Sequence, residues 1–361
     1  MPHQTPPLLP TRARPFFGPI IGAAVLMSIG LILVPPALAA SASPAPPHEG
    51  FDWRRIGIQS DNDEYAGING HDHWYTSGVR LDVLGHGRHL PDQLSMSTGC
   101  PAMLGEAARG HGRGYVSVGQ DIYTQNIRTQ TEPNPNDRPV AGLLWLQAGR
   151  SLRQSTSRAD LRLELGVTGP AALGEQTQDT IHSILGVAQV PLWQNQLRPR
   201  LGLNLHLGCL NQLRFASDPW RSSTVNLHYG LSLGNLLSQA SAGIALAYGP
   251  DSQRLHLPRI ARHVDPVREP VRQWVLATGI SARAVFHDYL VDGDAFGYQS
   301  QVHSRRWQGE AFVSLAVAIG GHWQISYSIV RRTLDFDGPG VAAQGFKPQT
   351  VGLIAIEAPL Y

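Results

Sequence analysis

The chain has 361 residues, of which 42% are hydrophobic and only 16% are charged. Its 29 basic and 27 acidic residues nearly cancel to +2, which excludes the basic excess typical of a nucleic-acid binder. High hydrophobicity with low net charge also excludes an intrinsically disordered chain. Two cysteines are too few for a disulfide-rich scaffold, and the sequence does not show whether Cys100 and Cys209 pair.

The N-terminal segment is predicted to direct export and not to join the fold. An apolar run over 16–34 follows two arginines, and the small-x-small pattern Ala-Leu-Ala comes next at 37–39. This order predicts a signal peptide over 1–39 and a flexible leader over 40–50. The alternative is an uncleaved membrane anchor, because the apolar run is long enough to cross a bilayer.

The remaining chain, 51–361, is dominated by alternation with a period of two. Over 201–208, for example, leucine occupies every odd position, and glycine, asparagine or histidine every even one. Successive side chains of a strand point to opposite faces, so this pattern predicts strands with one apolar and one polar face. About twelve such segments occur, near 52–60, 76–85, 113–121, 141–149, 159–168, 199–208, 224–234, 241–249, 271–286, 310–319, 322–331 and 350–357.

An even number of antiparallel strands with this alternation is typical of an outer-membrane barrel. The polar face lines the lumen, the apolar face meets lipid, and closure leaves no strand edge in the hydrocarbon. We therefore predict an all-β fold, an antiparallel transmembrane β-barrel of about twelve strands. A soluble β-sandwich is the alternative, because its strands alternate too.

One connection lacks the alternation and is predicted to be helical. Ile181, Ile184 and Leu185 lie at helical spacing, and Gly186 is a suitable stop, so we expect a short helix near 174–186. Gln178 and His182 are four residues apart and would share one face of this helix.

Two polar clusters flank the first predicted turn. Asp61-Asn62-Asp63-Glu64 ends the first strand, and its oxygen atoms suit calcium, although a solvated loop would have the same composition. Asp72-His73-Trp74-Tyr75-Thr76 opens the second strand. Because consecutive strands of a barrel are neighbours, the two clusters are expected to face each other across one hairpin.

Both clusters belong to a series of motifs along the chain: Asp61-Asn62-Asp63-Glu64-Tyr65, Asp72-x-x-Tyr75-Thr76-x-Gly78, Gly119-Gln120-x-Ile122-Tyr123-Thr124, Asp137-Arg138-Pro139-x-Ala141-Gly142, Gln178-x-x-x-His182, Trp193-x-x-Gln196-Leu197 and Leu290-x-Asp292-Gly293. These motifs resemble those of the LpxR-like family of lipid A 3′-O-deacylases. They occur in the family's order and cover nearly all of the predicted barrel.

The resemblance implies an outer-membrane enzyme whose partners are lipid A, or lipopolysaccharide, and outer-membrane lipids. The implied reaction is calcium-dependent hydrolysis of the 3′ ester, which releases the acyloxyacyl chain. The family's catalytic set falls on Asn62, Asp63, Thr76, Gln178 and His182, with calcium as cofactor near Asn62 and Asp63. A shifted alignment would instead place the Asn-Asp pair on Ser60 and Asp61. We expect a monomer that binds no nucleic acid.

The chemistry of these side chains agrees with ester hydrolysis. His182, with an ordinary pKa near 6.5, suits a general base for water. Calcium would polarise the ester carbonyl, and Gln178 and Thr76 could bind the water or the oxyanion. Two other functions remain open: an outer-membrane phospholipase or other esterase built on the same barrel, and a non-enzymatic barrel. Arginines over 250–270 suit lipid phosphates, but a solvated loop explains them equally well.

Overall fold

The computed structural model describes residues 52–67, 73–86, 111–126, 132–153, 156–216, 222–255, 257–258, 270–293, 301–320 and 322–360. The chain divides into two units, Met1–Ser41 and Ala42–Tyr361, and all described residues belong to the second. The predicted signal peptide and leader therefore lie outside the described residues, as does Cys100. Cys209 is disulfide-bonded. Within the described ranges no helix has the length and apolar character needed to span a membrane.

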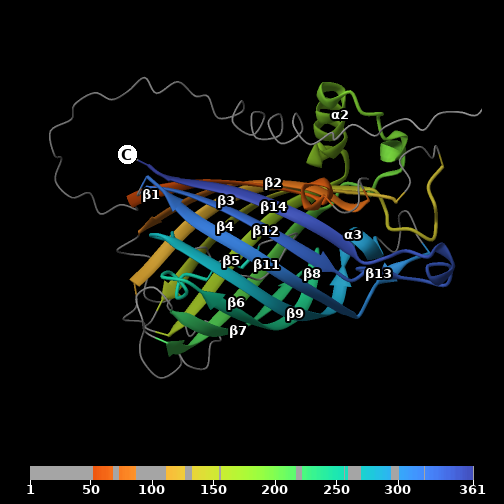
Figure 1. Cartoon of the computed structure of the whole chain (residues 1–361). Helices are drawn as coiled ribbons and strands as arrows, with labels where there is room; N and C mark the ends of the chain where they lie inside the picture. Colours follow the sequence, from red (N-terminus) through yellow and green to blue (C-terminus); the bar gives the residue numbers. More distant parts are fainter. Residues whose placement is uncertain are drawn as a thin grey trace, which may run out of the picture. The chain divides into compact units, whose positions relative to one another are not determined.

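Twelve antiparallel strands form one closed barrel (Figure 1), which confirms the predicted fold. The strands are β1 (Asp52–Asn62), β2 (Trp74–His86), β3 (His111–Thr124), β4 (Ala141–Arg153), β5 (Ser157–Thr168), β6 (Leu201–Ala216), β7 (Ser223–Gly234), β8 (Leu237–Tyr248), β9 (Trp274–Asp288), β11 (Trp307–Ile319), β12 (Trp323–Arg332) and β14 (Gln349–Pro359). Each pairs with its neighbours along the chain, and β1 closes the barrel against β14. Every predicted segment overlaps one of these strands.

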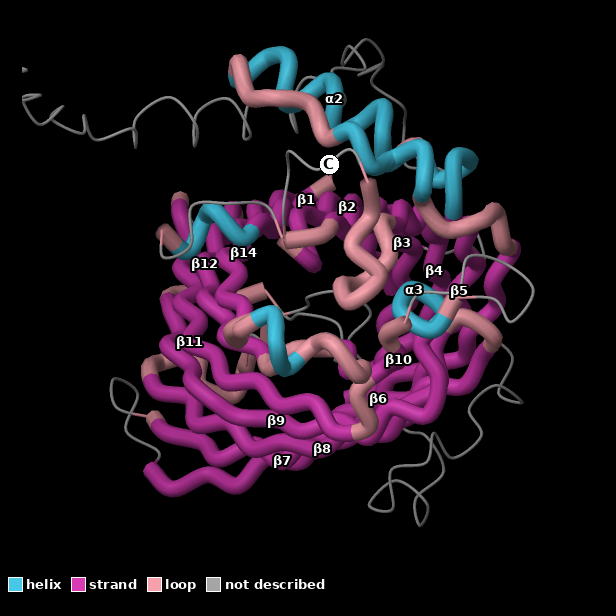
Figure 2. The backbone as a smooth tube through the Cα atoms, turned by 90° about the vertical axis from the view of Figure 1, so that its right-hand side faces the viewer, coloured by secondary structure: helices cyan, strands magenta, loops and turns pink. Residues whose placement is uncertain are grey.

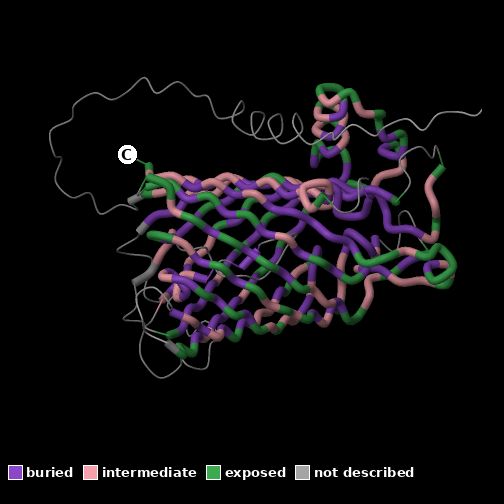
Figure 3. The backbone as a smooth tube through the Cα atoms, viewed as in Figure 1, coloured by how far each residue is buried: buried purple, intermediate pink, exposed green. Residues whose placement is uncertain are grey.

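The wall is apolar outside and polar inside, as the alternation predicts. In β6, Leu201, Leu203 and Leu205 are exposed, whereas Asn204 and His206 between and beyond them are buried in the lumen. Figure 3 shows the same alternation of exposed and buried positions along the strands. A soluble sandwich buries its leucines between two sheets, whereas a membrane barrel presents them to lipid. The single closed sheet thus excludes the sandwich.

Exposed aromatic side chains mark both ends of the apolar wall. Phe286 and Trp307 lie where β9 ends and β11 begins, and Tyr248 and Trp323 lie at the opposite ends of the strands. Aromatic girdles of this kind flank the lipid-facing band of outer-membrane barrels. We call the end at which β1, β3 and β5 finish the α2 rim, after the helix α2 (Gly174–Leu185) that follows β5.

Hydrogen-bonded polar side chains line the lumen. The Glu164 carboxylate accepts from Gln147 Nε2 at 2.7 Å and from Asn204 Nδ2 at 2.6 Å. Arg162 lies 3.2 Å from the Asp160 carboxylate, and both are almost fully buried. Such groups persist away from bulk water only when they are paired, so the described part of the lumen is a packed polar core.

A small second core lies at the α2 rim. We call it the cap: α3 (Tyr289–Asp292), the two-stranded sheet of β10 (His303–Ser304) and β13 (Phe336–Asp337), and the segments 132–140 and 333–348. Figure 2 shows α3 and β10 of the cap in a view along the ring of strands. The buried apolar residues of this core are Trp74, Val291, Val302, Leu334, Phe336 and Val341.

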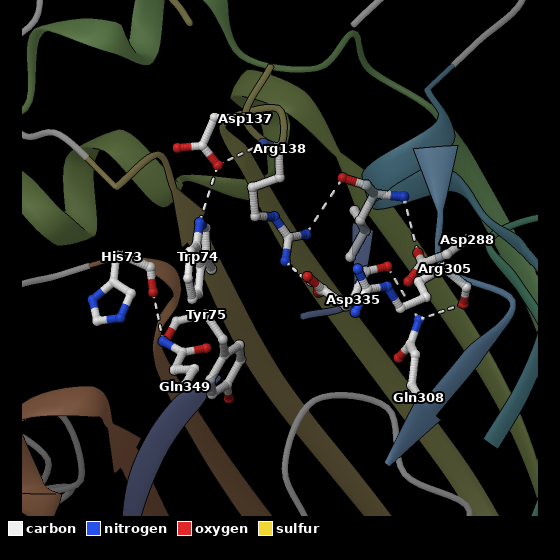
Figure 4. Close-up of polar contacts among 11 residues, drawn as sticks. His73, Trp74, Tyr75, Asp137, Arg138, Asp288, Arg305, Gln308, Asp335 and Gln349 are labelled. Carbon is white, nitrogen blue, oxygen red and sulfur yellow. Dashed lines mark hydrogen bonds and ion pairs between the residues drawn. The ribbon is translucent and has the colours of Figure 1, made fainter. Parts of the chain in front are cut away.

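Polar contacts hold the cap together and join it to the barrel (Figure 4). Arg138, 1% exposed, donates to Asp335 Oδ2 at 2.6 Å and to the Leu290 carbonyl at 3.4 Å. Trp74 Nε1 donates to Asp137 Oδ1 at 3.0 Å. Burial raises the pKa of Asp137 to about 6, although hydrogen bonds to its carboxylate oppose the change. The loops of this rim are therefore held together by buried, charge-assisted bonds.

The helix α2 packs against the outer side of the wall (Figure 2). Gln120 of β3 shares its face with the exposed Val116 and Val118, and its Nε2 donates to the Ala172 carbonyl at 2.6 Å. Gly142 of β4 lets the first residue of the helix approach closely, since a Cβ there would lie 3.3 Å from Gly174 Cα. The predicted helix near 174–186 is thereby confirmed, and Gly186 ends it with φ 66°.

Candidate active site

The ends of β1, β2 and β3 bring the predicted polar residues to the α2 rim. The register pairs Asn62 with Ser77, and Ser77 with Ile122, so these three residues form a row across the strands. Asn62 lies at an outward-facing position of β1. Asp61 points into the lumen, where its carboxylate accepts a hydrogen bond from the Tyr75 hydroxyl. The shifted alignment, which assigns the Asn-Asp pair to Ser60 and Asp61, would place the carboxylate of the pair on the lumen side, away from α2.

Asn62 and Asp63 are held by backbone N–H groups. Asn62 caps the 3-10 helix η1 (Asp63–Ala66), and its Oδ1 accepts from the Glu64 amide at 2.7 Å. Asp63 is 1% exposed, and its Oδ2 accepts from the His73 amide at 3.0 Å. The His73 ring lies alongside, with Nδ1 at 3.3 Å from the same oxygen. The clusters on either side of the first turn thus meet, as expected.

Thr76 is placed by an irregularity in β2. The register between β2 and β3 shifts between Tyr75 and Ser77, and Thr76 occupies the shift. Its hydroxyl is 2.7 Å from the hydroxyl of Thr124, and both threonines are nearly buried. Thr124 lies on the outward face of β3, two residues beyond Ile122 and so about 7 Å further towards the rim.

The helix α2 turns a polar stripe towards the wall. Gly174, Gln178 and His182, spaced by four residues, are its buried positions. Ile184 is instead 54% exposed, and Ile181 and Leu185 are partly exposed. A helix on a soluble protein buries its apolar stripe, so the inverted arrangement indicates a helix whose outer side faces lipid.

A short return of the chain fixes the tautomer of His182. After Gly186 the backbone turns back, and the Ala188 carbonyl lies 2.7 Å from His182 Nδ1. A carbonyl oxygen only accepts, so Nδ1 carries the proton and Nε2 carries the lone pair. This is the tautomer that a general base requires at Nε2.

Gln178 and Thr76 are linked through β3. The Gln178 carbonyl accepts from Trp193 Nε1 at 2.7 Å. Trp193 packs in one buried cluster with Ile122, which shares its face of β3 with Thr124. All five predicted residues thus lie at the α2 rim, and Asn62, Thr76, Gln178 and His182 lie on its outer side.

Backbone strain occurs on both sides of this arrangement. Among the described non-glycine residues, only Trp74 and Leu173 have positive φ angles, each 58°. Trp74 begins the strand that carries Thr76, and Leu173 precedes the helix that carries Gln178 and His182. Left-handed conformations of such bulky residues are costly and concentrate at functional sites.

Sequence reasoning assigned no role to His73, Thr124 or Trp193. Their contacts depend on the bulge in β2 and on the reversal of the chain after α2. Neither feature produces a periodic pattern in the sequence from which it could be predicted. Arg254, from the predicted basic loop, lies at the opposite rim and is 3.5 Å from Asp251; the other arginines of that loop fall outside the described residues.

A serine-histidine-acid group, separate from the candidate site, lies in the lumen. Ser232 Oγ is 2.9 Å from His206 Nδ1, and His206 Nε2 is 3.4 Å from Glu164. Gly230-x-Ser232-x-Gly234 even matches the hydrolase elbow motif. Ser232, however, is 0% exposed within β7 and pairs with the strands on both sides, so the strand-to-helix turn of that motif is missing. We assign this group to the polar core of the lumen.

The donor atoms near Asn62 and Asp63 suit calcium in type. Calcium takes six to eight oxygen ligands, and both residues offer oxygen. No group of three or more His, Cys, Asp or Glu side chains within the described ranges could hold a metal ion. Backbone carbonyls, water or substrate oxygens would have to complete the coordination.

Comparison with known proteins identifies the family. The sequence profile of the family described as outer membrane protein LpxR matches residues 25–346. The chain belongs to the LpxR family. LpxR from Salmonella typhimurium has the same fold, with a TM-score of 0.67 and 18% identity over 84% of this chain and 99% of that chain. This LpxR family membership and the closed barrel support an outer-membrane location.

Two further solved barrels match with lower TM-scores. The β domain of the Bordetella autotransporter BrkA gives a TM-score of 0.40 at 9% identity, over 86% of this chain and 99% of that chain. The COG4313 outer membrane channel from Pseudomonas putida F1 gives 0.40 at 10% identity, over 90% and 100%. None of the curated proteins matches this LpxR-family chain.

Proposed function

We propose that this protein is a lipid A 3′-O-deacylase that hydrolyses the 3′-linked acyloxyacyl ester of lipid A. Membership of the LpxR family supports a lipid A deacylase. The observation that carries the proposal is the buried polar stripe of α2, which presses Gln178 and His182 against the outer side of the wall. A lipid substrate reaches that side from the membrane, whereas a solute passing through the lumen would not.

His182 is the proposed general base. Its Nε2 lone pair takes a proton from water as the water oxygen attacks the ester carbonyl carbon. The new C–O bond converts the carbonyl oxygen to an oxyanion. When the tetrahedral intermediate collapses, the ester C–O bond breaks, and the imidazolium returns the proton to the leaving sugar oxygen. The Ala188 carbonyl holds the Nδ1 proton in place throughout.

Gln178 and Thr76 are the proposed oxyanion donors. Thr124 can donate to the Thr76 oxygen at 2.7 Å, which leaves the Thr76 proton for the substrate. Donors fixed in advance stabilise the charge that develops in the transition state without having to reorganise. Asp63 is proposed to keep the turn at His73 in place.

Calcium is part of the proposal. Asn62 and Asp63 would hold the ion, which would polarise the ester carbonyl as a Lewis acid. Titration of the detergent-folded protein with terbium, followed by sensitised luminescence, reads binding independently of activity. We expect Asp63→Ala to weaken the signal and Asp251→Ala, at the opposite rim, to leave it unchanged. Equal binding by both variants would move the ion away from Asp63.

The test of the function is mass spectrometry of lipid A after incubation with the folded wild-type protein. We expect loss of the acyloxyacyl group with calcium present, and intact lipid A with chelator. The same incubation with phospholipids tests the alternative esterase. Cleavage of phospholipid with intact lipid A would replace the proposed substrate, and no cleavage of either by a verified barrel would favour a non-enzymatic barrel.

We also propose that the protein acts as a monomer, because β1 and β14 of one chain close the barrel. Light scattering of the protein in detergent, corrected for bound detergent, should give the mass of a single chain. A stable dimer mass would contradict this.

A further inference from the structure

We infer that Trp193 is a positioning residue that fixes the Gln178 side-chain amide so that its NH₂ group, and not its carbonyl, faces the reacting ester. The inference rests on the proposed function for the identity of the ester. The contact between Trp193 and Gln178 joins the 3-10 helix η5 (Pro191–Asn195) to α2.

The orientation of the amide follows from the chemistry of the indole. Trp193 Nε1 is 2.7 Å from Gln178 Oε1, and an indole N–H can donate but not accept. The amide oxygen must therefore face Trp193, because the opposite flip would set two donors against each other. The NH₂ group of Gln178 is then turned away from Trp193.

The NH₂ group of Gln178 is not used by the described part of the protein. Gln178 is 3% exposed, and its Nε2 has no hydrogen-bond partner among the described residues. Buried donors without partners are rare in proteins because they lose their hydration without compensation. A donor kept in this state, one helical turn from His182, is suited to the oxyanion that forms only during hydrolysis.

Trp193 is itself rigidly held. It is 1% exposed and belongs to the cluster Ile122, Val140, Val190, Leu192 and Trp193 between η5 and the wall. Its ring fits beneath the start of α2 because residue 174 is glycine: a Cβ there would lie 2.6 Å from the ring. The indole N–H is therefore a fixed reference for the amide, in the way that supporting groups orient catalytic ones.

Loss of the indole N–H should act through Gln178. With phenylalanine at position 193 the ring can still fill the cluster, but nothing holds the amide oxygen. The amide can then turn over and set its carbonyl against the oxyanion, which repels it. A residue that only supported the fold would lower activity to the same extent whether or not Gln178 is present.

A double-mutant cycle separates these cases. We expect Trp193→Phe to lower kcat roughly tenfold with little change in KM, a part of the 10²–10³-fold loss that follows removal of an oxyanion donor. In a Gln178→Ala background the same substitution should change kcat less than twofold, since no amide remains to be oriented. Equal losses in both backgrounds, or no loss in the wild-type background, would overturn the inference.

Trp145→Phe is the matched control. Trp145 is also buried, and its Nε1 donates to Asp121 Oδ2 at 3.1 Å, but on the lumen side of the wall. The Trp145→Phe variant should therefore have the same kcat as the wild type. If the wild-type protein leaves lipid A intact but cleaves a phospholipid, only the proposed substrate fails, and the cycle is run on the phospholipid ester. If it cleaves no ester, both the function and the inference are refuted.

Discussion

At the scale of single residues, two proposed catalytic side chains, His182 and Gln178, each have one polar atom hydrogen-bonded to the protein. That bond determines whether the second polar atom of the same side chain accepts or donates a hydrogen bond. The Ala188 carbonyl accepts a hydrogen bond from His182 Nδ1, and Trp193 Nε1 donates one to the carbonyl oxygen of Gln178. The sequence predicted that Gln178 and His182 share a face, since the spacing of four residues suffices for that. It could not predict their bonded partners, because those lie beyond the end of α2 in a segment without periodicity.

Thr76 offers a test at this scale. Thr76→Val keeps the shape of the side chain but removes the proposed donor and the contact with Thr124. We expect kcat for lipid A to fall about 10²-fold, while Thr76→Ser retains most activity. Thr278→Val, which removes a hydroxyl bonded to the Phe312 carbonyl elsewhere in the wall, serves as control. Full activity in Thr76→Val would show that another group binds the oxyanion.

At the scale of elements, α2 shows both what a sequence pattern can predict and where it fails. The helical spacing of Ile181, Ile184 and Leu185 and the stop at Gly186 predicted the helix. A soluble protein would have packed these apolar residues inwards. Here the polar stripe is buried and the apolar side is exposed, because the helix lies on a wall that faces lipid.

The fit of α2 against the wall can be tested with one methyl group. A Cβ at residue 174 would lie 2.6 Å from Trp193 and 3.2 Å from Gly142 Cα, so Gly174→Ala must move the ring or the helix. We expect at least a tenfold loss of kcat in a protein that still folds, judged by its heat-modifiable band on a gel. Gln176→Ala, on the exposed side of the same helix, should match the wild-type rate. Wild-type activity in Gly174→Ala would mean that close packing here is dispensable.

At the scale of the whole molecule, alternation alone predicted the barrel. All twelve predicted segments became wall strands, and the structure extends most of them by a few residues. The sequence predicted none of the cap's helix and strands, because β10 and β13 have two residues each and no detectable period. The bulge at Thr76 could not be predicted from the sequence either, since it depends on pairing between two strands.

The cap predicts how stability depends on pH. Burial raises the pKa of Asp137 from 3.8 to about 6, so the folded protein holds this proton more tightly than the unfolded chain. The stabilisation of the folded state by this bound proton is complete below pH 3.8 and is lost as pH rises through 6. The loss in the free energy of unfolding is at most about 3 kcal/mol, at about 1.4 kcal/mol per pKa unit. Between pH 4.5 and 7.5 the melting temperature of Asp137→Asn should fall less than that of the wild type. Identical profiles would contradict the raised pKa.

The central claim is that His182, held on the outer side of the wall, activates water for hydrolysis of a lipid A ester. The most direct test compares the wild type with His182→Ala and with His322→Ala, a histidine at the opposite rim, by mass spectrometry of lipid A. General-base loss predicts a rate at least 10²-fold lower for His182→Ala with the barrel still folded. The control variant should release the acyloxyacyl group at the wild-type rate. Wild-type cleavage by folded His182→Ala would contradict the account.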